Sequence, residues 1–227
     1  DKPLYTGFAP NCFVAISPDG TQLVYVGRLD KSDTELYVRS MDALQIKPIP
    51  GTRNAHNPFF SPNGQWVGFF TGNQLKKVRL AGGPPSTLHE DIPMGHTAFG
   101  SWAHDGTIVF SVSRGNRCIQ RIADKAGQQA EILVPPVSKD DQAYYCYPQV
   151  LPENDAILFS HVDSIVSRNS RIEAFLTETR VRKTVLRDAC YARYVNSGHL
   201  IFVRNKTLMA IPFDVERLTP TGRAIPL

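Results

Sequence analysis

The hydrophobic pattern of the chain consists of short alternating segments separated by tight turns. Around Ser61-Pro62-Asn63-Gly64, apolar residues precede the turn, and an aliphatic residue, one intervening residue and an aromatic residue follow it. Pro presets φ at the first turn corner, Asn or Asp hydrogen-bonds its own backbone, and Gly accepts a positive φ. Segments with a period of two residues on both sides of such a turn predict a β-hairpin.

The same pattern recurs five times along the chain. Its turns are Ser17-Pro18-Asp19-Gly20, Ser61-Pro62-Asn63-Gly64, Ala103-His104-Asp105-Gly106, Leu151-Pro152-Glu153-Asn154 and Asn196-Ser197-Gly198, with last residues about 44 positions apart. Two more apolar segments follow each hairpin, so each repeat predicts four strands. Four antiparallel strands in a repeat of this length are typical of a β-propeller blade. The predicted repeat units are approximately 11–53, 54–94, 95–140, 141–188 and 189–227.

These repeats predict one all-β domain over residues 1–227, a β-propeller of five recognisable four-stranded blades. A β-sandwich also alternates short strands with turns. It does not repeat the same turn chemistry at every fourth strand, which favours the propeller. The Gly-His and Trp-Asp pairs of the WD40 repeat are missing.

The repeat resembles that of the TolB-like (WD40-like) β-propeller family. The resemblance rests on residues 59–70 (FFSPNGQWVGFF), followed by Leu75-Lys76-Lys77-Val78 and Gly82-Gly83-Pro84-Pro85. It is closest to the propeller region that follows the kinase domain of bacterial eukaryotic-like serine/threonine kinases, and it covers essentially the whole chain. Two turns depart from the family pattern, because His104 replaces Pro in the third and the fifth has no Pro-Asp pair.

The resemblance implies a non-catalytic binding or sensor module that recognises a protein or a small ligand. The chain would be a piece of a bacterial signalling kinase or of a TolB-like protein, with an extracytoplasmic location in the periplasm or at the cell surface. TolB-like propellers commonly have six or more blades, so we expect this chain to be part of a larger ring. An incomplete ring leaves a strand edge and a blade face open, which favours dimerisation.

Composition and charge add a few constraints. Apolar residues make up 42% and charged residues 20% of the chain, a globular balance that excludes wholesale disorder. The net charge is +4, and the excess of Lys and Arg lies in the last two repeats, around Arg180, Arg182 and Lys183. This skew raises an alternative function, a basic surface for a polyanion, although no nucleic-acid partner is expected. No apolar run reaches the roughly 20 residues of a membrane-spanning helix.

Catalytic motifs are absent from the sequence. It contains no G-x-S-x-G, H-E-x-x-H, P-loop, dinucleotide-binding or kinase motif, so we predict no enzyme activity and no cofactor. His104 and His199 fall in predicted turns, and His89 and His161 are expected at the surface. No C-x-x-C pair occurs, and no metal site is predicted. A five-bladed carbohydrate-active enzyme stays open as an alternative, because two carboxylates in the loops before the inner strands would suit glycosidic cleavage.

The candidate binding site consists of residues just before or at the start of the innermost strand of each repeat. In a propeller these segments gather around one mouth of the central channel, where ligands commonly bind. Aromatic rings, amides, histidines and an arginine suit a peptide or a small polar ligand. Alternatively, these side chains only solvate the channel mouth and pack the loops. The predicted ligand-binding residues are Asn54, His56, Asn57, His96, Tyr145, Tyr191 and Arg193.

Overall fold

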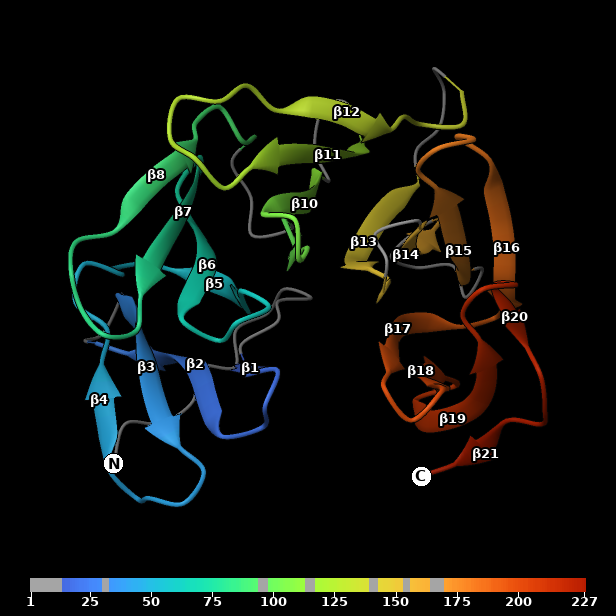
Figure 1. Cartoon of the computed structure of the whole chain (residues 1–227), viewed down its shortest axis with the longest axis horizontal. Helices are drawn as coiled ribbons and strands as arrows, with labels where there is room; N and C mark the ends of the chain where they lie inside the picture. The colour runs from blue at the N-terminus through green and yellow to red at the C-terminus, as the bar shows by residue number, and fades with distance from the viewer. Residues whose placement is uncertain are drawn as a thin grey trace. The chain divides into compact units, whose positions relative to one another are not determined.

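The computed structural model describes residues 14–29, 33–93, 98–112, 117–138, 143–152, 156–163 and 170–227. The described residues form antiparallel sheets of strands that follow one another in sequence, with no α-helix among them (Figure 1). Five such sheets are present, which confirms the predicted all-β fold with five four-stranded blades. No helix with the length and hydrophobicity of a membrane span occurs within the described ranges.

The five blades follow one another along the chain and are coloured from blue to red in Figure 1. Blade 1 comprises β1 (Val14–Ile16), β2 (Gln22–Arg28), β3 (Thr34–Ser40) and β4 (Ile46–Pro48). Blade 2 comprises β5 (His56–Phe60), β6 (Trp66–Thr71), β7 (Gln74–Arg79) and β8 (Ser86–His89). Blade 3 comprises β9 (Gly100–Trp102), β10 (Thr107–Val112), β11 (Cys118–Ala123) and β12 (Glu131–Val134).

Blade 4 comprises β13 (Tyr144–Val150), β14 (Ala156–Val162), β15 (Ser170–Leu176) and β16 (Arg182–Arg187). Blade 5 comprises β17 (Cys190–Val195), β18 (His199–Arg204) and β19 (Thr207–Asp214). Two short strands, β20 (Thr219–Pro220) and β21 (Ile225–Pro226), both pair with β19. Together they form the fourth strand position of blade 5.

The chain divides into two compact units. The first contains residues 1–110 and 121–131, and the second contains residues 111–120 and 132–227.

Hydrogen bonds within the turns explain why the repeat pattern forms hairpins. In blade 1 the Asp19 carboxylate accepts hydrogen bonds from the Ser17 hydroxyl and from the Thr21 amide, and Gly20 has a φ of 72°. The Ser17 hydroxyl is the main cause that holds the pKa of Asp19 below its ordinary value. In blade 2 the Asn63 side-chain oxygen likewise accepts hydrogen bonds from the Ser61 hydroxyl and from the Gln65 amide. The turn sequence therefore closes each of these hairpins through its own side chains.

The core of the first unit lies between blades 1 and 2. Apolar side chains of both sheets interlock there and exclude water, since each sheet buries a face of aliphatic and aromatic residues. The core contains Val24, Val26 and Leu36 from blade 1 and Phe60, Val67, Phe69 and Val78 from blade 2.

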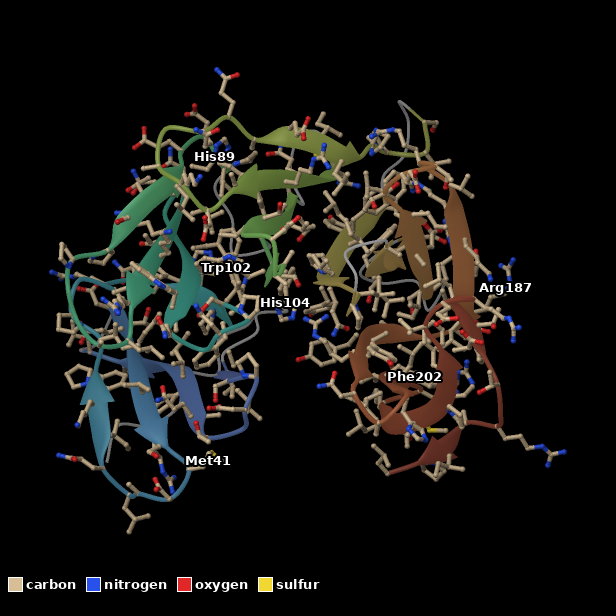
Figure 2. The ribbon with its side chains drawn as sticks, viewed as in Figure 1. Met41, His89, Trp102, His104, Arg187 and Phe202 are labelled. Carbon is tan, nitrogen blue, oxygen red and sulfur yellow. The ribbon has the colours of Figure 1, made fainter. Side chains whose placement is uncertain are left out.

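Lys77 joins blade 2 to blade 3 within the first unit. Its ammonium nitrogen lies 4.8 Å from the ring centroid of Trp66 and 5.7 Å from that of Trp102, which is labelled in Figure 2. The same nitrogen donates a hydrogen bond to the main-chain oxygen of Asp124 and lies 3.8 Å from its carboxylate. The lysine side chain is only 17% exposed, so these contacts replace much of its hydration.

The core of the second unit lies between blades 4 and 5. Leu158, Ile172 and Ala174 of blade 4 pack against the face of blade 5 that includes Leu200 and Phe202. Phe202 is fully buried and lies within blade 5 (Figure 2). Alternating residues of β14 point to this core, so the intervening residues of β14 point to the opposite face of blade 4.

Candidate ligand-binding site

The first strands of blades 2, 4 and 5 each contain a β-bulge. In β5, β13 and β17 the pairing with the next strand shifts by one extra residue. One residue of each bulge has a positive φ, namely Asn57 (50°), Tyr147 (55°) and Tyr191 (55°). A bulge re-aims a side chain and is common next to binding and active sites. The two bulges of the second unit, in β13 and β17, mark a candidate site.

Two of these three bulge residues are conformationally strained. Asn tolerates the left-handed backbone region, whereas a tyrosine there costs on the order of 1 kcal/mol or more. Tyr147 and Tyr191 adopt it at equivalent positions of adjacent blades. Strain of this kind persists where the surrounding structure imposes it, and it concentrates at functional sites. The two tyrosines therefore form the centre of the candidate site.

Arg193 completes what we call the tyrosine–arginine cluster, made of Tyr147, Tyr191 and Arg193. The two tyrosine rings meet edge to face, with centroids 4.8 Å apart and an interplanar angle of 76°. The guanidinium carbon of Arg193 lies 5.4 Å from the centroid of Tyr191. Nη1 of Arg193 donates hydrogen bonds to the main-chain oxygens of Tyr147 (2.8 Å) and Ala192 (3.2 Å). All three side chains are half-buried, which leaves part of each accessible to a ligand.

Side-chain hydrogen bonds between blades 4 and 5 hold the cluster in place. The Gln149 amide donates from Nε2 to the oxygen of Tyr194 (3.0 Å), and its Oε1 accepts from the nitrogen of Tyr194 (2.7 Å). The Ser160 hydroxyl accepts a hydrogen bond from the Tyr191 amide (2.8 Å). The inner strands of the two blades are thus joined at fixed positions, and the cluster is built on a rigid support.

The charge of the cluster indicates the kind of group it could bind. Arg193 forms no ion pair with any carboxylate in the described part of the chain, and Nη1 is the atom through which it contacts main-chain oxygens. A guanidinium beside two tyrosine rings suits a carboxylate or carbonyl oxygen flanked by an apolar group. Within the described residues, no group of three or more His, Cys, Asp or Glu side chains could hold a metal ion.

The structure brings two of the predicted site residues together, Tyr191 and Arg193. Tyr145, from the same unit, is fully buried inside blade 4, where its ring contacts Phe159 and His161. His96 lies outside the described residues. Tyr147 was not in the predicted set. Alignment of the repeats on the bulge, rather than on the turn, would have selected it, because it occupies the same bulge position as Asn57.

The other predicted residues belong to the first unit. Asn54 is exposed and has a φ of 57°, and its main-chain amide donates to the oxygen of Thr34 (2.7 Å). His56 and Asn57 are buried, and the Asn57 amide donates to the oxygen of Ala98 (2.6 Å). These two side chains therefore pack the first strand of blade 2. That the seven residues share one channel mouth stays a prediction.

A second group of polar side chains lies inside blade 4, and we call it the blade 4 polar network. Its members are Tyr145, His161, Asp163, Arg171, Glu173 and Arg182. Arg171 Nε lies 2.6 Å from Glu173 Oε1, and His161 Nδ1 lies 3.3 Å from the same oxygen. Arg182 Nη1 lies 2.8 Å from the Tyr145 hydroxyl and 3.6 Å from Glu173 Oε2.

The predicted surface position of His161 is wrong. The side chain is 3% exposed, because alternation along β14 places it on the buried face that also carries Phe159. His161 contacts the ring of Tyr145 at 5.1 Å between centroids. His104, in contrast, lies in the predicted turn between β9 and β10 (Figure 2).

Glu173 is the buried charge at the centre of the network. Burial by itself would raise the pKa of Glu173, but hydrogen bonds from His161 and Arg171 outweigh it and hold the pKa below its ordinary value. The carboxylate is therefore ionised and paired at neutral pH. Because its partners belong to three strands of one blade, the network has the character of a structural core.

Several Lys and Arg side chains of the last two blades donate hydrogen bonds to main-chain oxygens. Arg180 donates to the oxygen of Leu133 (3.3 Å), Lys183 to that of Arg217 (2.6 Å), and Arg204 to that of Arg187 (3.0 Å). Arg187 is itself exposed, and its side chain extends away from β16 in Figure 2. The basic skew of this region thus has a structural use, since these side chains join loops to blade edges.

Comparison with known proteins shows similarity at the level of structure. No family model and no curated protein matches the sequence. TolB from Acinetobacter baumannii superposes with a TM-score of 0.66 at 15% identity, over 95% of this chain and 56% of that chain. A protein assigned as TolB from Agrobacterium tumefaciens superposes with a TM-score of 0.64 at 17% identity, over 81% of this chain and 69% of that chain.

Similar propellers also occur in enzymes. The GH74 enzyme of Niastella koreensis superposes with a TM-score of 0.64 at 12% identity, over 87% of this chain and 36% of that chain. The chain thus spans about half to two thirds of the TolB structures and about a third of the GH74 enzyme. Identities this low establish architecture alone. In its fold, this chain is a β-propeller similar to the TolB proteins.

Proposed function

We propose that this chain is a non-catalytic binding module that recognises a protein or a small polar ligand at the tyrosine–arginine cluster. The observation that carries the proposal is the strained pair Tyr147 and Tyr191 with Arg193 packed beside them. Partly exposed aromatic rings next to an arginine are the residue types that dominate protein-recognition surfaces. The TolB-like fold supports the same interpretation, because propellers of many kinds serve as interaction platforms.

The finer proposal places this module in a bacterial sensor or signalling protein. The sequence resemblance to kinase-associated propellers supports this assignment, as does the absence of a catalytic motif in the sequence. An extracytoplasmic location is part of the same proposal. A carbohydrate-active enzyme is disfavoured because the tyrosine–arginine cluster contains no carboxylate. A polyanion surface is disfavoured because several of the basic residues concerned hold main-chain oxygens.

Selection of binding peptides from a random phage-displayed library tests the proposal. Enriched peptides would be synthesised, and their affinities for the wild-type chain and for Arg193→Gln, Tyr147→Asn and Tyr191→Asn measured by calorimetry. Asn accepts the positive φ of the bulge, so these two variants remove a ring while keeping the backbone conformation. Each variant is expected to weaken binding about tenfold or more, the loss usual for a central interface residue.

The matched control is Arg187→Gln, which removes an exposed arginine from the same unit outside the cluster. It should bind the selected peptides as the wild type does. Peptides that bind all three cluster variants with wild-type affinity would show that recognition takes place elsewhere. Failure to enrich any peptide that binds the wild-type chain would remove the support for polypeptide recognition.

A further inference from the structure

A groove runs between blades 1 and 2, within the first unit and apart from the proposed ligand site. Its volume is about 590 Å³, and its lining comes from the ends of β2, β3 and β4 on one side and from the β5–β6 turn and the end of β7 on the other. Polar and apolar residues both line it. The lining includes three glutamines, Gln22, Gln45 and Gln65, and two basic residues, Lys47 and Arg79.

Strand register shows that the groove continues the core between the two blades. Gln22 pairs with Ser40, and Lys47 pairs with Val38, so each pair shares one face of blade 1. Val38 packs against the core on this face. Where the apolar core ends, the face becomes polar, and the two sheets separate enough to leave the groove. Lys47 therefore lies on the side of blade 1 that faces blade 2.

The charged residues that line the groove are all basic. No Asp or Glu occurs among the described residues that line it. Lys47 and Arg79 are exposed and form no ion pair with any residue that the structure describes. Asp42 accepts a hydrogen bond from the Ser40 hydroxyl at the edge of this region but does not line the groove. An acidic group would thus meet two cations without a competing carboxylate.

One of the residues that line the groove has a buried polar atom without a partner. Oε1 of Gln22 is buried and makes no hydrogen bond within the described residues. A buried amide oxygen without a partner is unfavourable, so a donor supplied by a ligand would be favourable. Elsewhere in the molecule, Gln149 pairs through its amide with both main-chain groups of Tyr194. Glutamine side chains are thus used in this fold to hold an extended strand.

We propose that the interblade groove binds an extended acidic peptide segment. The main chain of the segment hydrogen-bonds to the side-chain amide of Gln22. An acidic side chain of the segment forms an ion pair with Lys47, and Arg79 adds a second positive charge to the same groove. The inference does not depend on the tyrosine–arginine cluster, because every residue that carries it lies in blades 1 and 2.

The test measures fluorescence polarisation of a labelled octapeptide of alternating Glu and Gly, against the same peptide with Gln in place of Glu. The acidic peptide should bind the wild-type chain saturably and more weakly as salt is raised. Lys47→Gln should weaken binding about two- to fivefold, as expected for a partly exposed ion pair. Gln22→Met, which keeps side-chain length but removes the acceptor, should weaken it about fivefold.

Lys125→Gln is the matched control, since Lys125 is an exposed lysine of the same unit that does not line the groove. It should bind as the wild type does. Unchanged affinity in both Lys47→Gln and Gln22→Met would overturn the assignment of the site. Equal binding of the Gln peptide, or no saturable binding of the Glu peptide, would overturn the assignment of the ligand. Competition by sodium phosphate as strong as that by free peptide would indicate a simple oxyanion pocket and would overturn the peptide assignment.

Discussion

Replacement of Glu173 by Gln keeps the size of the side chain and removes one negative charge from the interior of blade 4. The carboxylate is 7% exposed. It lies 2.6 Å from Arg171 Nε, 3.3 Å from His161 Nδ1 and 3.6 Å from Arg182 Nη1. In Glu173→Gln both arginines would keep their charge, and one of the two carboxylate oxygens would become a nitrogen that donates hydrogen bonds. The substitution therefore opposes like groups in a confined space.

The expected loss of stability follows from the burial of the partners. Removal of one member of a fully buried ion pair costs about 3–5 kcal/mol. Here Arg171 and Arg182 are 27% and 20% exposed, so water recovers part of that loss. We expect Glu173→Gln to lower the free energy of unfolding by about 2–3 kcal/mol. For a chain of this size, such a loss corresponds to a Tm lower by roughly 5–10 °C.

Urea unfolding followed by far-UV circular dichroism measures this loss. Glu178→Gln is the control, because Glu178 is exposed in the turn after β15. It removes the same charge and should leave the unfolding midpoint unchanged. A midpoint for Glu173→Gln that lies within about 0.5 kcal/mol of wild type would refute the reasoning, since the network would then contribute no net stability.

The same pair of proteins yields a prediction for pH. The folded pKa of Glu173 lies below its ordinary value of 4.5, because hydrogen bonds from His161 and Arg171 outweigh the opposing effect of burial. A group with a lowered folded pKa contributes stability that is fully present above its unfolded pKa and lost as pH falls through the folded one. The difference between wild type and Glu173→Gln should stay constant from pH 7 to about 5 and shrink below 4.5. A difference that grows toward acid pH would contradict the sign.

Two further substitutions test contacts of the first unit. Lys77→Met keeps the length of the side chain but removes its charge from between Trp66 and Trp102; we expect a loss of about 2 kcal/mol. Since these are the only two tryptophans of the chain, their fluorescence reports unfolding at this site, and an unchanged midpoint would show that the charge contributes nothing. In Gly100→Ala the new methyl group would lie 2.3 Å from the ring of Phe59; we expect a loss of about 1–3 kcal/mol by urea unfolding. Adding Phe59→Leu should recover part of it, whereas fully additive losses would argue against the steric cause.

The sequence predicted the blades well because their turns are local. Ser17, Asp19 and Gly20 determine their hairpin through contacts within six residues, and the same chemistry recurs at a fixed period. Strand existence and order could therefore be derived from the pattern alone. A fourth strand was predicted for the last repeat, and β21 confirms it, but the additional pairing of β20 with β19 was not predicted because β20 is too short to carry a period.

The candidate site was predicted less completely because it depends on bulges. A bulge changes the face of the sheet on which the following side chains lie. Tyrosine is not a residue type that signals a positive φ, so the sequence gives no sign of the bulges at Tyr147 and Tyr191. Burial was misjudged at His161 for a related reason. Asp163 is close to His161 in the sequence, but its other partners Glu173 and Arg171 lie on the next strand, so the local sequence shows only part of the charges around His161.

Each sheet is built from strands that follow one another along the chain, and this order has a consequence for how the molecule acquires its structure. A blade can complete its own ladder of hydrogen bonds once its segment of about 44 residues is available, without waiting for distant parts of the chain. Closure of short loops costs little conformational entropy, so any blade can act as the starting point. During synthesis the blades would form one after another from the N-terminus.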